Sequence, residues 1–424
     1  MKKINLNVPK WRKLDNSAKI FPLSSGRKNS TVFRLSVILK ENIDAKILKK
    51  AVIEALEVYK CFKVKMKKGF FWHYLKFNEK VPIIEEEKNE PCKFIDPNTN
   101  NEYLFKITYK DNRINIDIFH ALTDGNNGTI FFKEIIYTYL ELKYPKQLKS
   151  KHNRVIRKVE YNTEDSYIKH YNKRVKPNQI YKRAYKIGGE KLNKGKINVV
   201  HQIINLEELK TEAKKHNATI TQYLTAVLMY SIYSKNYLKY KGKAPIKVCI
   251  PVNLKKYFPS KTLTNFFSYI TIVGNTNKLN FNLFDEILEF VKKEFERQLT
   301  IDEVIKIMSN NVKLGTHLFI KTIPLFLKIP IVRLAYLEIR RHLTITYSNI
   351  GRIGILGEYQ KYIDNFFILI APESFERVKC SSCTFENKMV FTTTGNIEKT
   401  GIEEGFFEFL KQKNISVELI CEKY

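Results

Sequence analysis

The sequence of 424 residues lacks the long apolar runs and export signals that direct a chain into or across a membrane. Its most hydrophobic stretch, residues 318–337, is interrupted by lysine, arginine and proline. A membrane-spanning helix needs about 20 nearly uninterrupted apolar residues. The basic first residues are not followed by an apolar run, so they do not resemble a signal peptide. We therefore expect a cytoplasmic protein.

Cysteine is sparse, with six residues scattered at positions 61, 92, 249, 380, 383 and 421. A structural zinc site needs four ligands, usually arranged as two close pairs. The one close pair here, Cys380 and Cys383, lies in a segment with the composition of a β-strand. We expect reduced structural thiols and no metal site.

Acidic residues are few relative to basic ones: the chain has 43 Asp and Glu and 74 Lys and Arg, which gives a net charge of +31. The lysines are spread along the chain instead of forming one block, which is typical of a solvated surface. The sequence therefore predicts no nucleic-acid partner. It predicts a general attraction for anionic ligands, including phosphorylated cofactors.

The apolar pattern predicts two halves of alternating strands and helices. In the first half we expect strands at 31–39, 62–66, 70–77, 103–109 and 113–119, and helices at 44–59 and about 129–142. After a polar segment, 143–198, we expect strands at 199–204, 247–252, 267–273, 343–347, 366–370, 389–393 and 416–420. Helices are expected at 206–216, 219–238, 285–299 and 401–411. Because several strands adjoin directly, the fold class is α/β with mixed-sheet, α+β sandwich layers, in two units, 1–190 and 191–424.

One segment points to chemistry: His120-Ala-Leu-Thr-Asp124-Gly125, at the end of an expected strand. A histidine there can present its imidazole in a crevice, and Asp124 can bind a nearby cation and lock the loop. Gly125 leaves room for a ligand to approach the backbone. In a chain of this length and composition, the HxxxDG pattern is expected about 0.01 times by chance. The alternative is a loop histidine that happens to lie beside an Asp–Gly turn. Phosphate-loop, dinucleotide-binding, zinc-protease and serine-hydrolase motifs are absent.

Together with HxxxDG, further blocks resemble the chloramphenicol-acetyltransferase-like acyltransferase superfamily, and within it the bacterial alcohol acetyltransferase branch. These blocks are Gly69-Phe-Phe-Trp72, Pro251-Val-Asn-Leu254, Thr264-Asn-Phe-Phe267 and Ser348-Asn-Ile-Gly351. They occur in the expected order over about residues 30–410.

The resemblance implies two pseudo-symmetric subdomains with a tunnel between them, and no tightly bound cofactor. An acyl-CoA donor would enter from one side and a small alcohol or amine from the other. His120 would act as general base and Asp124 would hold the loop. Candidate oxyanion donors are Asn265, Ser268 and Asn349. Lys255, with Lys256 and Lys261, could meet the phosphates of coenzyme A, or could belong to a solvated loop.

Two positions depart from the family pattern. Condensation domains carry a second histidine directly before the catalytic one, whereas this chain has Phe119, which favours a free-standing acyltransferase. The aspartate of the family usually pairs with an arginine, but the matching strand offers Lys63 or Lys65.

We therefore predict a coenzyme A-dependent O-acyltransferase that acetylates an alcohol. The alternatives are a donor carried on a carrier protein, an amine acceptor, or a non-catalytic binding protein of the same fold. For residues 318–337, a buried helix over the acceptor channel is favoured above a helix on a membrane surface, so any membrane contact would be peripheral.

Overall fold

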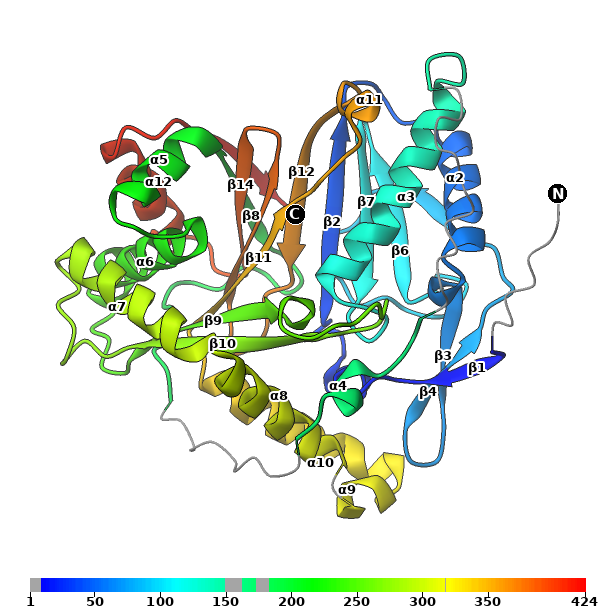
Figure 1. Cartoon of the computed structure of the whole chain (residues 1–424), viewed down its shortest axis with the longest axis horizontal. Helices are drawn as coiled ribbons and strands as arrows, with labels where there is room; N and C mark the ends of the chain where they lie inside the picture. Colours follow the sequence, from blue (N-terminus) through cyan, green and yellow to red (C-terminus); the bar gives the residue numbers. More distant parts are fainter. Residues whose placement is uncertain (1–8, 149–161, 173–182, 317) are drawn as a thin grey trace.

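Two mixed β-sheets stand side by side in the computed structural model, which describes residues 9–148, 162–172, 183–316 and 318–424 (Figure 1). The first sheet has five strands in the order β12-β2-β7-β6-β5. Their bounds are Ile363–Ile370, Val32–Leu39, Arg113–Phe119, Phe105–Lys110 and Ile84–Glu86. The β5–β6 pair is parallel and the other pairs are antiparallel.

The second sheet has seven strands in the order β10-β9-β11-β13-β14-β8-β15. Their bounds are Phe267–Gly274, Ile246–Asn253, Ile345–Arg352, Val378–Phe385, Lys388–Gly395, Asn198–Asn205 and Val417–Lys423. Strand β11 runs parallel to both of its neighbours, so this sheet is also mixed.

Helices cover the outer face of each sheet (Figure 1). Helices α2 (Ala45–Val58) and α3 (Gly125–Lys143) lie on the five-stranded sheet, and the carboxylate of Asp44 caps α2 by accepting from the backbone amides of Lys46 and Ile47. Helices α5 (Leu206–Lys215), α6 (Ile220–Ile232), α7 (Phe284–Gln298) and α12 (Ile402–Gln412) lie on the other side of the molecule, against the seven-stranded sheet. Thr219 caps α6 with a capping box, and a π turn over residues 233–237 extends it.

The two sheets pack against each other through β12 of the first and β13 and β14 of the second. Side-chain hydroxyls join them: Ser381 Oγ donates to the carbonyl of Ile368 at 2.6 Å, and Thr394 Oγ1 to that of Ile370 at 2.6 Å. The predicted α/β fold is confirmed. The division at 190/191 stays a prediction, and β12, from the second half of the sequence, lies in the sheet of the first half.

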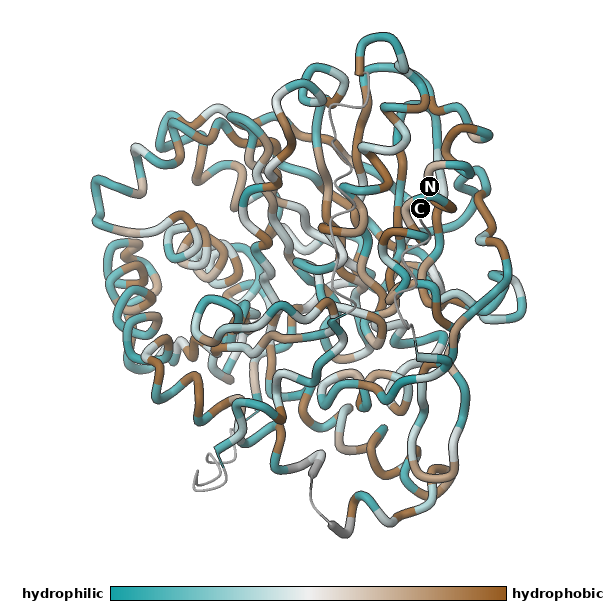
Figure 2. Tube along the Cα trace, turned by 45° about the vertical axis from the view of Figure 1, so that its right-hand side comes forward, coloured by the Kyte–Doolittle hydropathy of each residue, from teal (hydrophilic) through white to brown (hydrophobic). Residues whose placement is uncertain are grey.

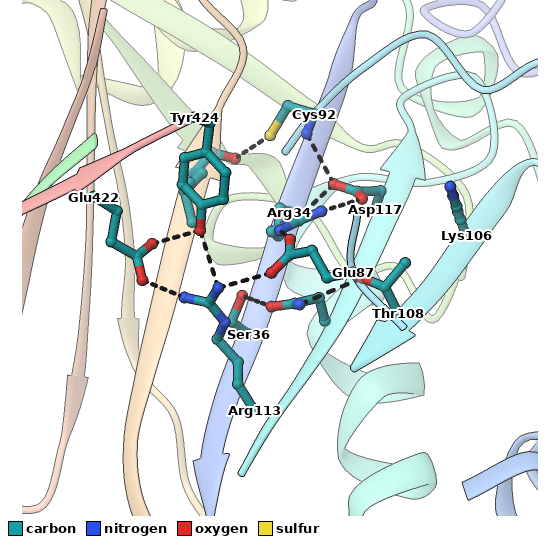
Figure 3. A network of polar contacts seen from close by, with 12 residues as sticks. Arg34, Ser36, Glu87, Cys92, Lys106, Thr108, Arg113, Asp117, Glu422 and Tyr424 are labelled. Atoms are coloured by element: carbon teal, nitrogen blue, oxygen red, sulfur yellow. Dashed lines mark hydrogen bonds and ion pairs between the residues drawn. The ribbon is translucent and has the colours of Figure 1, made fainter. Parts of the chain in front are cut away.

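A buried polar network fixes strand β7 from both sides (Figure 3). Arg34 on β2 makes two bonds to Asp117 on β7, at 2.9 and 2.6 Å, and also contacts Glu87. Arg113 at the start of β7 donates to Glu422 on β15 at 2.5 Å. Because these ion pairs are largely shielded from water, they fix the position of the strand that ends before His120.

Cys380 and Cys383 are three residues apart on β13, so they lie on opposite faces of the strand and pack into different cores. Within the described ranges the structure contains no group of three or more potential metal-ligating side chains. No helix among these residues is long and apolar enough to cross a membrane.

The lower part of the molecule in Figure 1 holds a small sheet and a group of helices. The sheet has the order β1-β4-β3, with bounds Trp11–Lys13, His73–Phe77 and Val64–Lys68. The helices here are α1 (Phe21–Ser24), α4 (Ser166–Lys169), α8 (Ile301–Thr316), α9 (Leu318–Thr322) and α10 (Leu325–Arg341), whereas α11 (Gly357–Gln360) lies at the top.

The expectation of a buried helix over residues 318–337 is wrong. Phe326 and Leu334 of α10 are each 70% exposed. The helix instead turns basic side chains inward, because Lys328 and Arg340 find partners there. Leu325 and Tyr336 are buried beside them, whereas Leu327 and Ile331 are also left on the outside.

Candidate active site

His120 follows directly after strand β7, and its backbone amide still bonds to the carbonyl of Thr31 at 3.0 Å. Aromatic rings hold the imidazole from several sides. Phe21 of α1 stacks on it at 4.7 Å between ring centroids, while Phe33 and Phe267 lie at 5.2 and 5.1 Å. Burial among these rings lowers the pKa of His120, and the charge of Asp124 offsets part of that effect.

A chain of hydrogen bonds connects the imidazole to a buried carboxyl group. His120 Nδ1 lies 3.0 Å from Oδ1 of Asn265, which is fully buried. The amide group of Asn265 in turn donates to Asp15 Oδ2 at 3.0 Å, and its backbone N–H donates to the same oxygen at 3.2 Å. Burial raises the pKa of Asp15 to about 6, against bonds from Ala18 and Asn265 that lower it. Both oxygens of Asp15 accept from backbone N–H groups, Oδ1 from Ala18 and Oδ2 from Asn265.

These contacts select one tautomer of the histidine. Both Asp15 oxygens act as acceptors, so the NH₂ group of Asn265 faces Asp15 and the amide oxygen faces His120. The amide oxygen also only accepts, so His120 Nδ1 must carry a proton. The lone pair of the neutral ring is then on Nε2.

Asp124 joins the two halves of the chain through backbone amides. Oδ1 accepts from the N–H of Asn127 at 2.9 Å and caps helix α3, and Oδ2 accepts from the N–H of Phe266 at 2.9 Å. Neither Lys63 nor Lys65 is the cation that was expected to pair with Asp124, because Lys63 bonds to Glu57 and Lys65 bonds to Glu102. Local amide groups supply the positive ends of dipoles where the family pattern uses an arginine.

Lys255 belongs to the frame of the same loop. Its ammonium group donates to Oδ1 of Asn127 at 2.7 Å and to the carbonyl of Thr262 at 2.6 Å. Burial lowers the pKa of Lys255, and the nearby charge of Asp124 offsets part of that shift. With two acceptors already bound, Lys255 is better assigned to holding the loop than to binding phosphate. The side chains of Lys256 and Lys261 are exposed.

Gly125 lies against the Ser348–Gly351 block of strand β11. A Cβ atom at Gly125 would stand 3.0 Å from Cδ1 of Ile350, so the space beside this glycine is filled by protein. Asn349, next to Ile350, donates to Thr221 Oγ1 at 3.0 Å and accepts from the N–H of Gly351 at 2.8 Å. Both ends of its amide are thus used within the fold.

Ser268 lies on strand β10, one residue after the Phe267 ring that contacts His120. Side chains alternate along a strand, so Ser268 shares the face of Ile270, which packs into the core of the second half. Its buried Oγ has no hydrogen-bond partner within the described residues. The structure therefore brings Asn265, Asp124 and Gly125 close to His120, and turns Ser268 toward the other side of β10.

Several residues of the site were not found from the sequence. Asp15 begins a turn in which its Oδ1 accepts from the N–H of Ala18 at 2.8 Å, and this local pattern could have indicated a turn. Nothing in the sequence indicates its contact with Asn265, 250 residues away. Phe21 and Tyr167 were also missed; the hydroxyl of Tyr167 bonds both backbone groups of Phe267.

Residues 163–297 match the model of the alcohol acetyltransferase family. This range includes Asn265 and Lys255 and ends before the Ser348–Gly351 block; it begins after His120 and Asp124. No curated protein matches the sequence.

Solved structures share the fold over nearly the whole chain. The trichothecene 15-O-acetyltransferase TRI3 from Fusarium sporotrichioides is 8% identical, covers 96% of this chain and 98% of its own, and has a TM-score of 0.61. TRI101 from the same organism, solved with coenzyme A and T-2, is 10% identical, covers 96% and 99%, and scores 0.59. Polyketide synthase associated protein 5 from Mycobacterium tuberculosis is 12% identical, covers 94% and 96%, and scores 0.56. These likenesses show that this chain shares the fold of the acetyltransferases, and the family match over residues 163–297 agrees with the resemblance found in the sequence.

The role of Asp124 can be tested by Asp124→Ala. The variant loses a helix cap and leaves the buried N–H of Phe266 without an acceptor, which together should lower the free energy of unfolding by about 2–4 kcal/mol in urea. Asp44→Ala is the matched control, because Asp44 also caps a helix but at an exposed site, where the expected loss is about 1 kcal/mol. Equal losses in the two variants would contradict the inter-half contact.

Proposed function

We propose that this chain is a coenzyme A-dependent O-acyltransferase that acetylates an alcohol, with His120 as general base. The observation that carries the proposal is the hydrogen bond from His120 Nδ1 to Asn265. It gives the ring a fixed orientation and leaves a basic Nε2. A strand-end imidazole held in this way is the group that removes a proton from an attacking hydroxyl.

The reaction would proceed by direct attack on the thioester. Nε2 of His120 takes the proton of the acceptor hydroxyl while the oxygen forms a bond to the thioester carbonyl carbon, and the carbonyl electron pair moves to its oxygen. When this tetrahedral intermediate collapses, the carbon–sulfur bond breaks and the imidazolium returns the proton to the leaving thiolate. The products are the ester and free coenzyme A.

The residues around His120 suit a transient imidazolium. The oxygen of Asn265 faces the Nδ1–H, and the charge of Asp124 favours the protonated ring. Asn265 is therefore a positioning residue in this proposal, in place of the oxyanion donor suggested by its motif. Positioned proton transfer of this kind contributes roughly 10²–10⁴-fold to rate.

The family match and the fold support the choice of reaction. The matched family acetylates alcohols by its description, and TRI101, a structure of the same fold, was solved with coenzyme A. A donor on a carrier protein remains the second candidate, since the epimerization domain of tyrocidine synthetase B also shares the fold at a TM-score of 0.56.

Replacing the base should remove activity without unfolding the protein. His120→Ala should lower acetyl transfer from acetyl-CoA to an alcohol by about 10²–10⁴-fold, measured as thiol release. The variant should still fold, with a melting temperature lower by only a few degrees because Asn265 loses a buried partner. His216→Ala, at the end of helix α5, is the matched control and should keep full activity. Full activity in His120→Ala would contradict the assignment of His120 as general base. Transfer from an acylated carrier protein but not from acetyl-CoA would favour the second candidate.

The pH dependence of kcat/KM should show the titration of His120. The protonated ring cannot accept a proton. A plot of log(kcat/KM) against pH should therefore rise with a slope of about one and level off above the pKa of His120. Because burial lowers the pKa of His120 below 6.5, the apparent pKa of this limb should lie below 6.5.

The control for this profile is Asp15→Asn, because the carboxyl of Asp15 also titrates at a pKa of about 6. The acid limb should persist in this variant, at reduced activity. A limb that disappears with Asp15, or one centred well above 6.5, would show that His120 is not the titrating base.

A further inference from the structure

Helix α10 buries Lys328 together with Leu325 and Tyr336, and leaves several large apolar side chains exposed. Lys328 is 2% exposed; its ammonium group donates to the carbonyl of Phe71 at 2.8 Å and lies 3.5 Å from the ring centroid of Trp72. Arg340 makes ion pairs with the buried carboxylates of Glu373 and Glu376 at 3.0 and 3.1 Å. These partners hold the basic face of the helix against the protein.

The outward face of α10 is apolar and exposed over its first three turns, up to Leu334. Leu327, Ile331 and Leu334 follow one another at helical spacing, and between 50% and 70% of each residue is exposed. Phe326, at the first turn, is also 70% exposed. A helix face of this kind is normally buried, so its exposure indicates a surface that meets something apolar.

The tip of the β3–β4 hairpin extends this surface. Phe70 is 70% exposed and its carbonyl accepts from the N–H of Leu325 at 2.8 Å, which fixes the hairpin beside the start of α10. We define the apolar face as Phe70, Phe71, Phe326, Leu327, Ile331 and Leu334. In Figure 1 the hairpin and α10 lie together at the lower end of the molecule, and Figure 2 shows hydrophobic stretches in this lower part.

Basic residues border the apolar face. Lys68 is exposed two residues before Phe70, and Lys321 is exposed on α9 just before α10 begins. Lys19 lies over the ring of Trp72 at 5.9 Å and is close enough to Lys321 for their charges to repel. An apolar strip with lysines at its edge is the pattern of a helix that lies in a lipid–water interface.

We propose that the apolar face docks on the surface of a bilayer that contains anionic lipids. The aromatic and aliphatic side chains would enter the boundary of the acyl chains, and the bordering lysines would meet the headgroups. A second copy of the chain fits less well, because both partners would bring the same lysines and a net charge of +31. Docking needs no spanning helix.

The position of the face relates it to the candidate active site. Helix α10 packs on α1, where Arg333 donates to the carbonyl of Leu23 at 3.1 Å, and Phe21 of the same short helix stacks on His120. If the proposed function holds, an apolar alcohol dissolved in the bilayer would therefore lie on the side of the molecule where α1 contacts His120. Only this consequence rests on the proposed function; the docking does not.

Vesicle co-sedimentation tests the docking directly. The full chain should bind vesicles of phosphatidylcholine mixed with phosphatidylglycerol, and bind phosphatidylcholine alone more weakly. The double variant Leu327→Asp/Leu334→Asp should bind the mixed vesicles at least about tenfold more weakly. The double variant Leu283→Asp/Leu419→Asp makes the same change of charge at exposed leucines outside the face and should bind as the parent does. His120→Ala should also keep vesicle binding, which separates this test from that of the proposed function.

Three results would overturn the proposal. The parent chain could fail to bind mixed vesicles. The two double variants could lose binding equally, which would make net charge the sole cause. Alternatively, sedimentation velocity could show a dimer that Leu327→Asp/Leu334→Asp converts to a monomer with no vesicle binding in either form, which would make the face an interface between copies.

Discussion

The side chain of Asn265 joins the two halves of the molecule at the imidazole of His120. Its oxygen faces His120 at the end of β7, and its NH₂ group is bound by Asp15, so one residue from the second half contacts two from the first. The neighbouring N–H of Phe266 is held by Asp124. Docking of the two halves and orientation of the ring are therefore the same event. A displacement of the loop that holds Asn265 and Phe266 would release the imidazole and remove one of the two N–H groups that bind Asp124.

The charges around the ring balance two opposing needs. Burial among aromatic rings keeps His120 neutral, as a base must be before reaction, because it lowers the pKa of the imidazole. Asp124 favours the protonated form that follows proton transfer, yet its own charge is compensated by backbone amides. Burial raises the pKa of Asp15 to about 6, and the three N–H groups that bind its carboxyl oppose this rise. Each carboxylate is thereby stabilised without a salt bridge to the ring.

The parts of this structure that depend on neighbouring residues were predictable from the sequence. The cap of α2 by Asp44, the strand that ends at Phe119 and the HxxxDG turn all follow from local spacing. The missed features depend on contacts between distant segments. Asp15 acquires its role only through Asn265, and β12 enters the first sheet by pairing with β2. The prediction of a buried helix over residues 318–337 was wrong for the same reason. The carboxylates that bind Arg340 on the inner side of α10 belong to residues 373 and 376, which are distant in the sequence.

The central claim, that Asn265 holds His120 as a neutral base with its proton on Nδ1, can be measured directly. Long-range ¹H–¹⁵N spectra of the ¹⁵N-histidine-labelled protein at pH 7 assign the ring of residue 120 by its loss in His120→Ala. The account predicts a protonated, pyrrole-type Nδ1 and a bare, pyridine-type Nε2, and a mixture of tautomers in Asn265→Ala. A ring protonated at Nε2, or doubly protonated at pH 7, would contradict it.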